Sequence, residues 1–140
     1  AAYFWPFLLY LILLGKFLDF PAKKRDHNMN FSESLKKNKD FQYVYKNGRS
    51  NANRYLVMYV IDNCTEKNRI GISVSKKVGN SIVRHRLTRL IRESYRLNED
   101  MFLRGKDIVV IARAGSKGKS FKEIESALLH LFRLHKMVPS

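Results

Sequence analysis

The stretch RIGISVSKKVGNSIVRHRLTRLIRESYR, residues 69–96, joins a strand pattern to a helix pattern and decides the fold. Large apolar side chains alternate with small or polar ones at its start, which predicts a strand over residues 69–75. The sequence Gly-Asn-Ser at 79–81 then supplies a flexible turn and two good helix N-caps. Apolar residues at helical spacing follow, so the stretch predicts a strand and a long helix in direct succession.

A helix that begins near Ser81 has two unlike sides. Apolar residues and one serine fall on the first side: Val83, Leu87, Leu90, Ile91, Ser94 and Leu97. Polar and basic residues fall on the second: Arg84, His85, Thr88, Arg89, Arg92 and Arg96. Only Glu93 is acidic between Lys76 and Leu97, so the repulsion between these cations is largely unrelieved. The pattern indicates an anionic partner, with RNA favoured; the alternative is a solvated helix, although such surfaces usually mix both signs of charge.

The start of this helix is a candidate anion site. No carboxylate occupies the first helical turn, while Lys76, Lys77 and Arg84 flank it. Free backbone N–H groups at a helix N-terminus bind phosphate well. A plain helix cap by Asn80 or Ser81 is the commoner explanation of the same residues.

The composition also favours a polyanionic partner. The chain has 140 residues, 45% of them hydrophobic, which suits one globular domain. Its 27 Lys and Arg outnumber 12 Asp and Glu, giving a net charge of +15. Nucleic acid is the first candidate partner, an anionic membrane the second and an acidic protein the third. The lone Cys64 excludes a disulfide within the chain and fits a reducing cytoplasm.

The amino-terminal segment differs from the rest. It begins AAYFWPFLLYLILLGKFLDF, an apolar run interrupted by Lys16 before it reaches the about 20 residues of a spanning helix. We expect residues 1–28 to be an extension outside the fold and residues 29–140 to form a single RNA-binding domain. A weak membrane anchor in residues 1–20 is the alternative.

The remaining patterns complete an α+β sandwich. A short helix is predicted over residues 39–46 with Asn38 as N-cap, a strand over 54–62, and a buried strand over 107–112. A capping box predicts a last helix from Ser120 to about residue 135. This order predicts helices packed on a mostly antiparallel sheet in two layers, with a strand–helix–strand crossover that the general rule makes right-handed.

The strand at 69–75 has a second face of small, polar residues: Gly71, Ser73 and Ser75. Such a face leaves room for a shallow groove that accepts an extended chain. An ordinary solvent-facing side of a sheet explains the same alternation.

No sequence motif indicates a catalytic or metal site. The four histidines, His27, His85, His130 and His135, are scattered, and none belongs to an HExxH or Cys/His pattern. There is no Walker loop, GxSxG or dinucleotide fingerprint. We therefore predict no catalytic residue and no protein-held metal, so any chemistry would lie in the partner.

Several segments resemble the bacterial ribonuclease P protein subunit. The stretch at 69–96 is similar to the signature of that family, and KNKDFQYVYKNGRS (37–50), DIVVIAR (107–113) and ALLHLFRL (127–134) match its other segments in the same order. The resemblance implies a fold like domain 2 of ribosomal protein S5, with a rare left-handed crossover in place of the default. It also implies a cytoplasmic protein.

The resemblance further implies the subunit of a ribonucleoprotein endoribonuclease that removes the 5′ leader of precursor tRNA. Catalysis would belong to the RNA partner, with Mg²⁺ held mainly by RNA and substrate phosphates and with one protein per RNA. The residues implied to bind the catalytic RNA are Lys76, Lys77, Asn80, Arg84, His85, Arg86, Arg89 and Arg92. Those implied to bind the leader are Phe41, Tyr45, Tyr59 and Ser73.

Two positions depart from the family pattern. His85 stands between Arg84 and Arg86 where the family usually has asparagine, and Thr88 stands where a basic residue is frequent. Histidine still donates a hydrogen bond and stacks, whereas threonine supplies no charge. Two other classes remain as alternatives: a general or ribosomal RNA-binding protein or chaperone, and a membrane-associated protein.

Overall fold

The computed structural model describes residue 29 and residues 31–139, so the predictions for residues 1–28 lie outside the described residues. Within that part the helices are α2 (Asn38–Asn47), α3 (Ser81–Asn98) and α4 (Phe121–Leu134). The strands are β1 (Ser32–Ser34), β2 (Arg49–Ala52), β3 (Leu56–Asp62), β4 (Asn68–Val74) and β5 (Lys106–Ala112). Two short 3-10 helices, η2 (Glu99–Met101) and η3 (Ala114–Ser116), flank β5.

The strands form one sheet in the order β1-β4-β5-β3-β2. β3 pairs antiparallel with β2 and β5, while β4 pairs parallel with β1 and β5. The sheet thus has two parallel and two antiparallel strand pairs. It was expected to be mostly antiparallel, so it contains more parallel pairing than predicted. The cause is α3, which returns the chain from the end of β4 to the start of β5 so that both strands run the same way.

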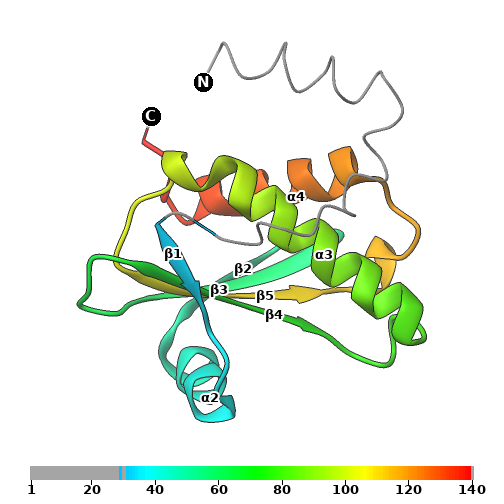
Figure 1. Ribbon diagram of the computed structural model, residues 1–140, viewed down its shortest axis with the longest axis horizontal. Coiled ribbons are helices and arrows are strands. Elements are labelled where there is room, and N and C mark those ends of the chain that lie inside the picture. Colours follow the sequence, from blue (N-terminus) through cyan, green and yellow to red (C-terminus); the bar gives the residue numbers. More distant parts are fainter. Residues whose placement is uncertain (1–28, 30, 140) are drawn as a thin grey trace.

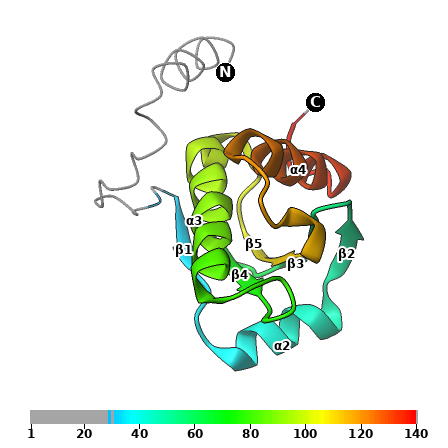
Figure 2. The ribbon, with the colours of Figure 1, turned by 90° about the vertical axis from the view of Figure 1, so that its right-hand side faces the viewer.

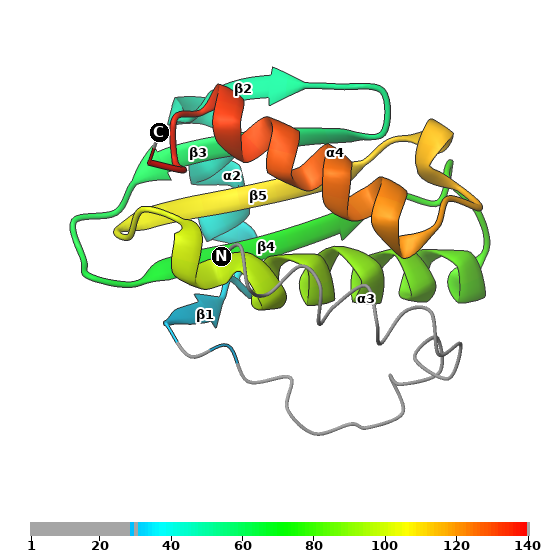
Figure 3. The same cartoon turned by 90° about the horizontal axis from the view of Figure 1, so that it is seen from above.

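Helices α3 and α4 lie together on one face of the sheet, as the sandwich prediction required, and α2 lies on the other face (Figure 1). In the view from above, α3 and α4 are nearest the reader and β5 lies between β4 and β3 (Figure 3). If the page is turned so that β4 and β5 point upward, β5 lies to the left of β4, and α3, which connects them, lies in front of the sheet. In a right-handed crossover seen this way, the second strand would lie to the right of the first. The β4–α3–β5 crossover is therefore left-handed, as the resemblance implies.

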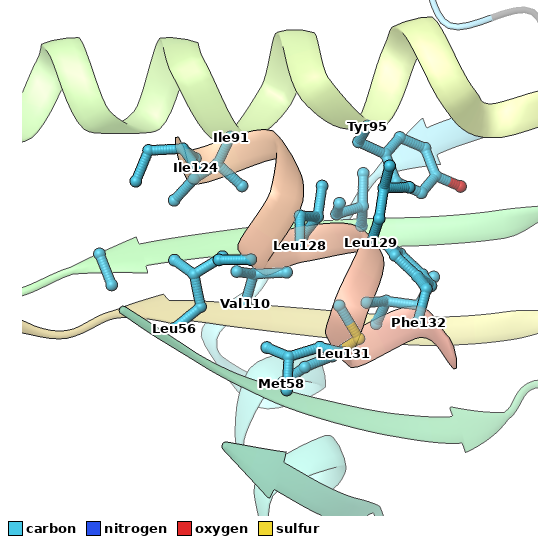
Figure 4. Close-up of a cluster of buried hydrophobic side chains, with 14 of the residues drawn as sticks. Leu56, Met58, Ile91, Tyr95, Val110, Ile124, Leu128, Leu129, Leu131 and Phe132 are labelled. Carbon is cyan, nitrogen blue, oxygen red and sulfur yellow. The ribbon is translucent and has the colours of Figure 1, made fainter. Parts of the chain in front are cut away.

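The main core fills the space between the sheet and the helix pair α3 and α4 (Figure 4). The predicted apolar side of α3 is confirmed at Leu87, Ile91 and Ser94, which are buried. Tyr95 is buried too, although the sequence pattern did not assign it to that side. Its ring lies beside Phe132, which stacks on Phe102 at 3.8 Å between ring centroids.

Tyr95 also ties an edge strand to the core. Its hydroxyl is 2.7 Å from the Ser32 hydroxyl of β1 and accepts a hydrogen bond from the Asn68 side chain. Burial raises the pKa of Tyr95, so the phenol stays neutral and keeps these bonds. The short strand β1 is thus held by α3 as well as by β4.

The ends of the helices test the capping predictions. At α4 the predicted capping box is confirmed: the Ser120 side chain accepts from the Glu123 N–H, and the Glu123 carboxylate accepts from the Ser120 N–H. At α2 the predicted N-cap was wrong by one residue. Lys37 is the N-cap, without a side-chain bond, and Asn38 is already helical. Gly48 ends α2 as expected.

Strands β1 and β2 were not predicted. Both lie at edges of the sheet and consist mostly of polar residues, SES and RSNA. An edge strand faces solvent along one side, so it needs no apolar alternation. Their pairing is instead set by neighbours far along the chain, β4 and β3.

His135 predicts a pH dependence of stability. This residue follows α4, is buried, and its Nε2 donates to the Met58 carbonyl at 3.1 Å. Burial and, more weakly, Arg49 lower the pKa of the imidazole below 6.5, although the bond to Met58 opposes this. The unfolded chain then binds a proton at higher pH than the folded one, so the free energy of unfolding should fall as pH drops below about 6.5. Urea unfolding at several pH values should show a weaker decline for His135→Gln; an identical decline would contradict this assignment.

Candidate nucleic-acid interface

The turn before α3 is organised by Asn80. Its side-chain oxygen accepts a hydrogen bond from the Val83 N–H at 3.0 Å, which makes Asn80 the N-cap of α3. The Arg84 Nε donates to the Gly79 carbonyl, which holds that side chain against the turn. No acidic residue lies in the first turn of α3, so the positive end of the helix is not neutralised there.

Besides Asn80, five of the predicted RNA-binding residues are exposed to solvent. They are Lys76, Lys77, His85, Arg86 and Arg89. None of them has a carboxylate partner within the residues that the structure describes. Arg86 donates to the Lys119 carbonyl at 3.0 Å and so reaches toward the loop before α4. The structure therefore leaves the charges of the two lysines and the two arginines available to an outside anion.

Arg84, Thr88 and Arg92 form a second row along α3, one turn apart and half-buried. Arg92 donates to the Ser34 hydroxyl of β1 at 2.9 Å. Burial lowers the pKa of this guanidinium, and no carboxylate within the described residues compensates it. A partly desolvated cation held in place by a neutral hydroxyl is well suited to a phosphate.

Arg96 differs from the other arginines of α3. It forms an ion pair with Glu93 at 2.5 Å, and its Nε donates to the same carboxylate at 3.0 Å. Its charge is thus already matched within the helix. The end of α3 nearest Asn98 is therefore less positive than the end nearest Asn80.

Thr88 provides a test of the row formed with Arg84 and Arg92. Its hydroxyl donates to the Arg84 carbonyl at 2.9 Å, an interaction within the helix that contributes little to stability. We expect Thr88→Lys to fold normally and to tighten RNA binding at low salt, by up to about tenfold for one added phosphate contact. Filter binding of the variant checks this; weaker binding by a well-folded variant would contradict the row's role.

On the opposite side of the sheet, three predicted leader-binding rings come together. We call Phe41, Tyr45 and Tyr59 the aromatic face. The Phe41 and Tyr45 ring centroids are 6.4 Å apart, and Tyr45 meets Tyr59 edge-on at 5.2 Å. All three rings are half-buried and pack on a small cluster of Leu35, Val44 and Val109. They are thus both part of the packing under α2 and partly open to solvent.

Gly71 permits the closest approach in the aromatic face. A Cβ at this position would lie 2.5 Å from the Phe41 ring, so only glycine lets that ring rest on β4. Ser73, the fourth predicted leader-binding residue, is two positions further along β4 and therefore on the same face. Figure 1 shows the sheet extending beyond α2 in that direction, toward the connection between β4 and α3.

Charged groups fix α2 on the sheet. The Arg69 guanidinium contacts the buried Asp107 carboxylate at 2.5 Å and Asp40 of α2 at 3.5 Å. The hydrogen bond to Asp107 raises the pKa of Arg69. These contacts set the position of Phe41 and Tyr45, which lie in the same helix. Sequence spacing gave no sign of them, because the three charged residues lie far apart along the chain.

One further group of basic residues was not predicted from the sequence. Arg54, Arg113, Lys117, Lys119 and Lys122 lie on the turn before β3 and around the start of α4. The only sequence signal was the Gly/Lys-rich segment after β5. No carboxylate pairs with them in the part of the chain that the structure describes.

The described residues contain neither a cluster of metal-ligating side chains nor a membrane-spanning helix. No three His, Cys, Asp or Glu side chains are grouped there to hold a metal ion. No helix among the same residues is long and apolar enough to cross a membrane.

Comparisons with known proteins place this chain's similarity in one family. The family model for ribonuclease P matches residues 29–136. A ribonuclease P protein component from Lachnoclostridium phytofermentans is 65% identical over 109 residues, which cover 78% of this chain and 94% of that protein. One from Alkaliphilus metalliredigens is 56% identical over 110 residues, covering 79% of this chain and 99% of that protein.

Solved structures give the same result. The RNase P protein of Staphylococcus aureus is 41% identical, with a TM-score of 0.72 over 76% of this chain and 98% of that one. The RNase P protein of Thermotoga maritima is 33% identical, with a TM-score of 0.68 over 73% of this chain and 96% of that one.

Proposed function

The chain belongs to the ribonuclease P protein family, and on that premise we propose that it binds the catalytic RNA of ribonuclease P and the 5′ leader of precursor tRNA. As a ribonuclease P protein component it is a subunit of an RNA-processing enzyme. Its proposed role is to promote cleavage that gives the mature 5′ end of tRNA. It would act in the cytoplasm, with one protein per RNA.

The proposed surface for the catalytic RNA is the exposed side of α3 and the turn before it. It consists of Lys76, Lys77, Asn80, Arg84, His85, Arg86, Arg89 and Arg92. The observation that carries the proposal is the unbalanced charge: among the described residues of this surface the cations have no carboxylate partners. Phosphates would relieve the repulsion between them. His85 is exposed between two arginines, so its ring is available for stacking or hydrogen bonding.

The proposed surface for the leader is the aromatic face with Ser73. Bases stack on aromatic rings with little sequence preference, as binding of many different leaders requires. The rings are half-buried: packing against the small cluster holds them in place, and part of each residue stays accessible to solvent. This arrangement suits an unpaired strand, which presents its bases, better than a duplex, which hides them.

Phe41→Leu tests the leader surface. Leucine keeps an apolar side chain over Gly71 but removes the ring, so we expect the holoenzyme to lose about 1–3 kcal/mol of affinity for precursor tRNA. Affinity for mature tRNA, which has no leader, should not change. The matched control is Tyr43→Leu on the same helix, because the Tyr43 side chain is 58% exposed and outside the aromatic face. An equal loss for both tRNAs would show that Phe41 acts only through packing.

The catalytic groups are proposed to belong to the RNA. Mg²⁺ would be held mainly by RNA and substrate phosphates, and it would stabilise the charge that develops during cleavage. The protein's own residues would then bind and position: the cations of α3 neutralise RNA phosphates, and the aromatic face orders the leader. None of the proposed residues is assigned a proton transfer or a nucleophilic attack.

Competition binding distinguishes this function from general RNA binding. The full chain is titrated with a labelled bacterial ribonuclease P RNA in the presence of an excess of a structured RNA of similar length. A specific subunit should keep its affinity within about threefold, whereas a chaperone that binds mainly phosphates would be displaced. Displacement in proportion to competitor concentration would contradict the proposal.

A further inference from the structure

The loops at the carboxyl ends of the parallel strands β4 and β5 lie at the same end of the molecule. The turn between β2 and β3 joins them, because Leu56 pairs with Ala112 at the end of β5. Figure 2 shows this end, with the loop after β5 lying between the start of α3 and the start of α4. Ligands of sheets with parallel strands commonly bind at such an end.

A shallow pocket of ≈ 410 Å³ opens here between the turn before β3 and α4. Its volume falls within the about 300–1,000 Å³ of small-ligand sites. The turn contributes Asn53, Arg54 and Tyr55 to the lining; α4 contributes Lys122, Glu123, Ser126, Ala127 and His130. The lining thus combines cations with an aromatic ring and an alanine methyl group.

The pocket is held in shape by Asn53. Its side-chain nitrogen donates to the Ala127 carbonyl of α4 at 2.9 Å, while its side-chain oxygen accepts from the N–H groups of Tyr55 and Leu56. Arg113 donates to the Asn53 carbonyl at 2.8 Å from the loop after β5. One residue therefore fixes the turn, the helix and the loop relative to one another.

The charge of the pocket is positive and continuous with α3. Arg54 and Lys122 are exposed, and neither pairs with a carboxylate of the described chain. The acidic lining residue, Glu123, stays ionised, because hydrogen bonds from the backbone and side chain of Ser120 lower its pKa, so two cations and one carboxylate leave the lining with one net positive charge. Lys119 bridges the two regions: its ammonium lies 5.3 Å from the centre of the Tyr55 ring, and its carbonyl accepts from Arg86 of α3.

We infer that this pocket binds a single nucleotide of the same RNA that lies along α3. Arg54 and Lys122 contact its phosphate, and the apolar lining from Tyr55 and Ala127 accepts its base or sugar. RNA is the occupant because Lys119, which contacts both Arg86 of α3 and the Tyr55 ring of the pocket, connects the cations of α3 to the pocket. The inference rests on the proposed function, since the RNA bound along α3 brings the nucleotide to the pocket.

The first test is the salt dependence of RNA binding by Arg54→Ala/Lys122→Ala. The full chain should lose about tenfold or more in affinity for a bacterial ribonuclease P RNA near 100 mM salt, and the slope of log K against log salt should flatten by about 1–2 units. The control is Arg133→Ala/Lys136→Ala, which removes the same charge at the other end of α4. Equal losses in the two variants would reduce the effect to net charge and overturn the inference.

The second test locates the RNA directly. A hydroxyl-radical reagent is attached to Ser126→Cys in a Cys64→Ser background, with Ile82→Cys on α3 and Leu134→Cys as references, because both positions are exposed. We expect discrete RNA cleavage from positions 126 and 82 and none from 134. Cleavage from 82 alone would overturn this inference and leave the proposed function intact. Absence of cleavage from both would contradict RNA binding at α3 itself.

Discussion

Replacing Lys77, Arg86 and Arg89 together by alanine should weaken binding of ribonuclease P RNA by about three orders of magnitude near 100 mM salt. Each phosphate contact contributes about 0.9 to the slope of log K against log salt, which corresponds to almost tenfold in affinity at that concentration. All three side chains are exposed and have no carboxylate partner among the described residues, so their removal costs the fold little. Fluorescence anisotropy across a salt series measures both the affinity for the RNA and the slope of log K against log salt.

A matched control separates position from charge. Lys36→Ala/Lys46→Ala/Arg133→Ala removes the same number of exposed cations from other parts of the described chain. We expect its affinity for the RNA to change by less than about fivefold, since distant charges are screened at this ionic strength. If both triple variants lose affinity equally, the exposed side of α3 is not the RNA-binding surface.

Phe132→Ala should lower the free energy of unfolding by about 3–5 kcal/mol, the range for buried aromatic residues. Phe132 is fully buried, stacks on Phe102 at 3.8 Å and lies 5.9 Å from Tyr95. It therefore joins α4 to α3 and to the segment before β5. Loss of the ring leaves a cavity in the cluster of buried side chains that Figure 4 shows around Phe132.

Leu134→Ala is the control for Phe132→Ala. It lies two residues further along α4, and its side chain is 46% exposed. We expect a change of no more than about 0.5 kcal/mol, as is usual for surface positions. Urea unfolding of both variants decides the matter: a loss below 1 kcal/mol for Phe132→Ala would contradict the described core.

Sequence periodicity predicted α3 and α4 well because each helix buries one side against the sheet. Leu87 and Ile91 are buried as their spacing required, and Ser120 with Glu123 forms the expected capping box. The apolar run of β5 correctly predicted a central strand, since Ile108 and Val110 face one layer and Val109 the other. The local residue pattern was therefore sufficient to predict α3, α4 and β5.

Elements that depend on distant partners were not predictable in the same way. Strand β1 has three polar residues and forms because β4 and Tyr95 bind it. The handedness of the crossover followed only from resemblance, because no single residue of α3 determines it. Likewise, the contacts of Arg69 with Asp40 and Asp107 arise from three separate segments.

The candidate site shows the same division. Helical spacing correctly separated the cations of α3 from its apolar side, but not the neutralised Arg96 from the uncompensated Arg92. Arg96 is paired with the Glu93 carboxylate one turn away, whereas Arg92 is hydrogen-bonded to the neutral hydroxyl of Ser34 in β1. The basic residues around the pocket at α4 were missed because they come from a turn, a loop and a helix start that only the fold brings together.

The most direct test of the central claim is cleavage of a precursor tRNA by a bacterial ribonuclease P RNA with and without the full chain, across a magnesium titration. The protein neutralises RNA phosphates that Mg²⁺ must otherwise screen, so we expect the RNA with protein to cut at the mature 5′ end at several-fold lower magnesium than the RNA alone. The triple variant at Lys77, Arg86 and Arg89 should lose most of this effect. An unchanged magnesium requirement with the wild-type protein, or specific cleavage by the protein without RNA, would contradict the account.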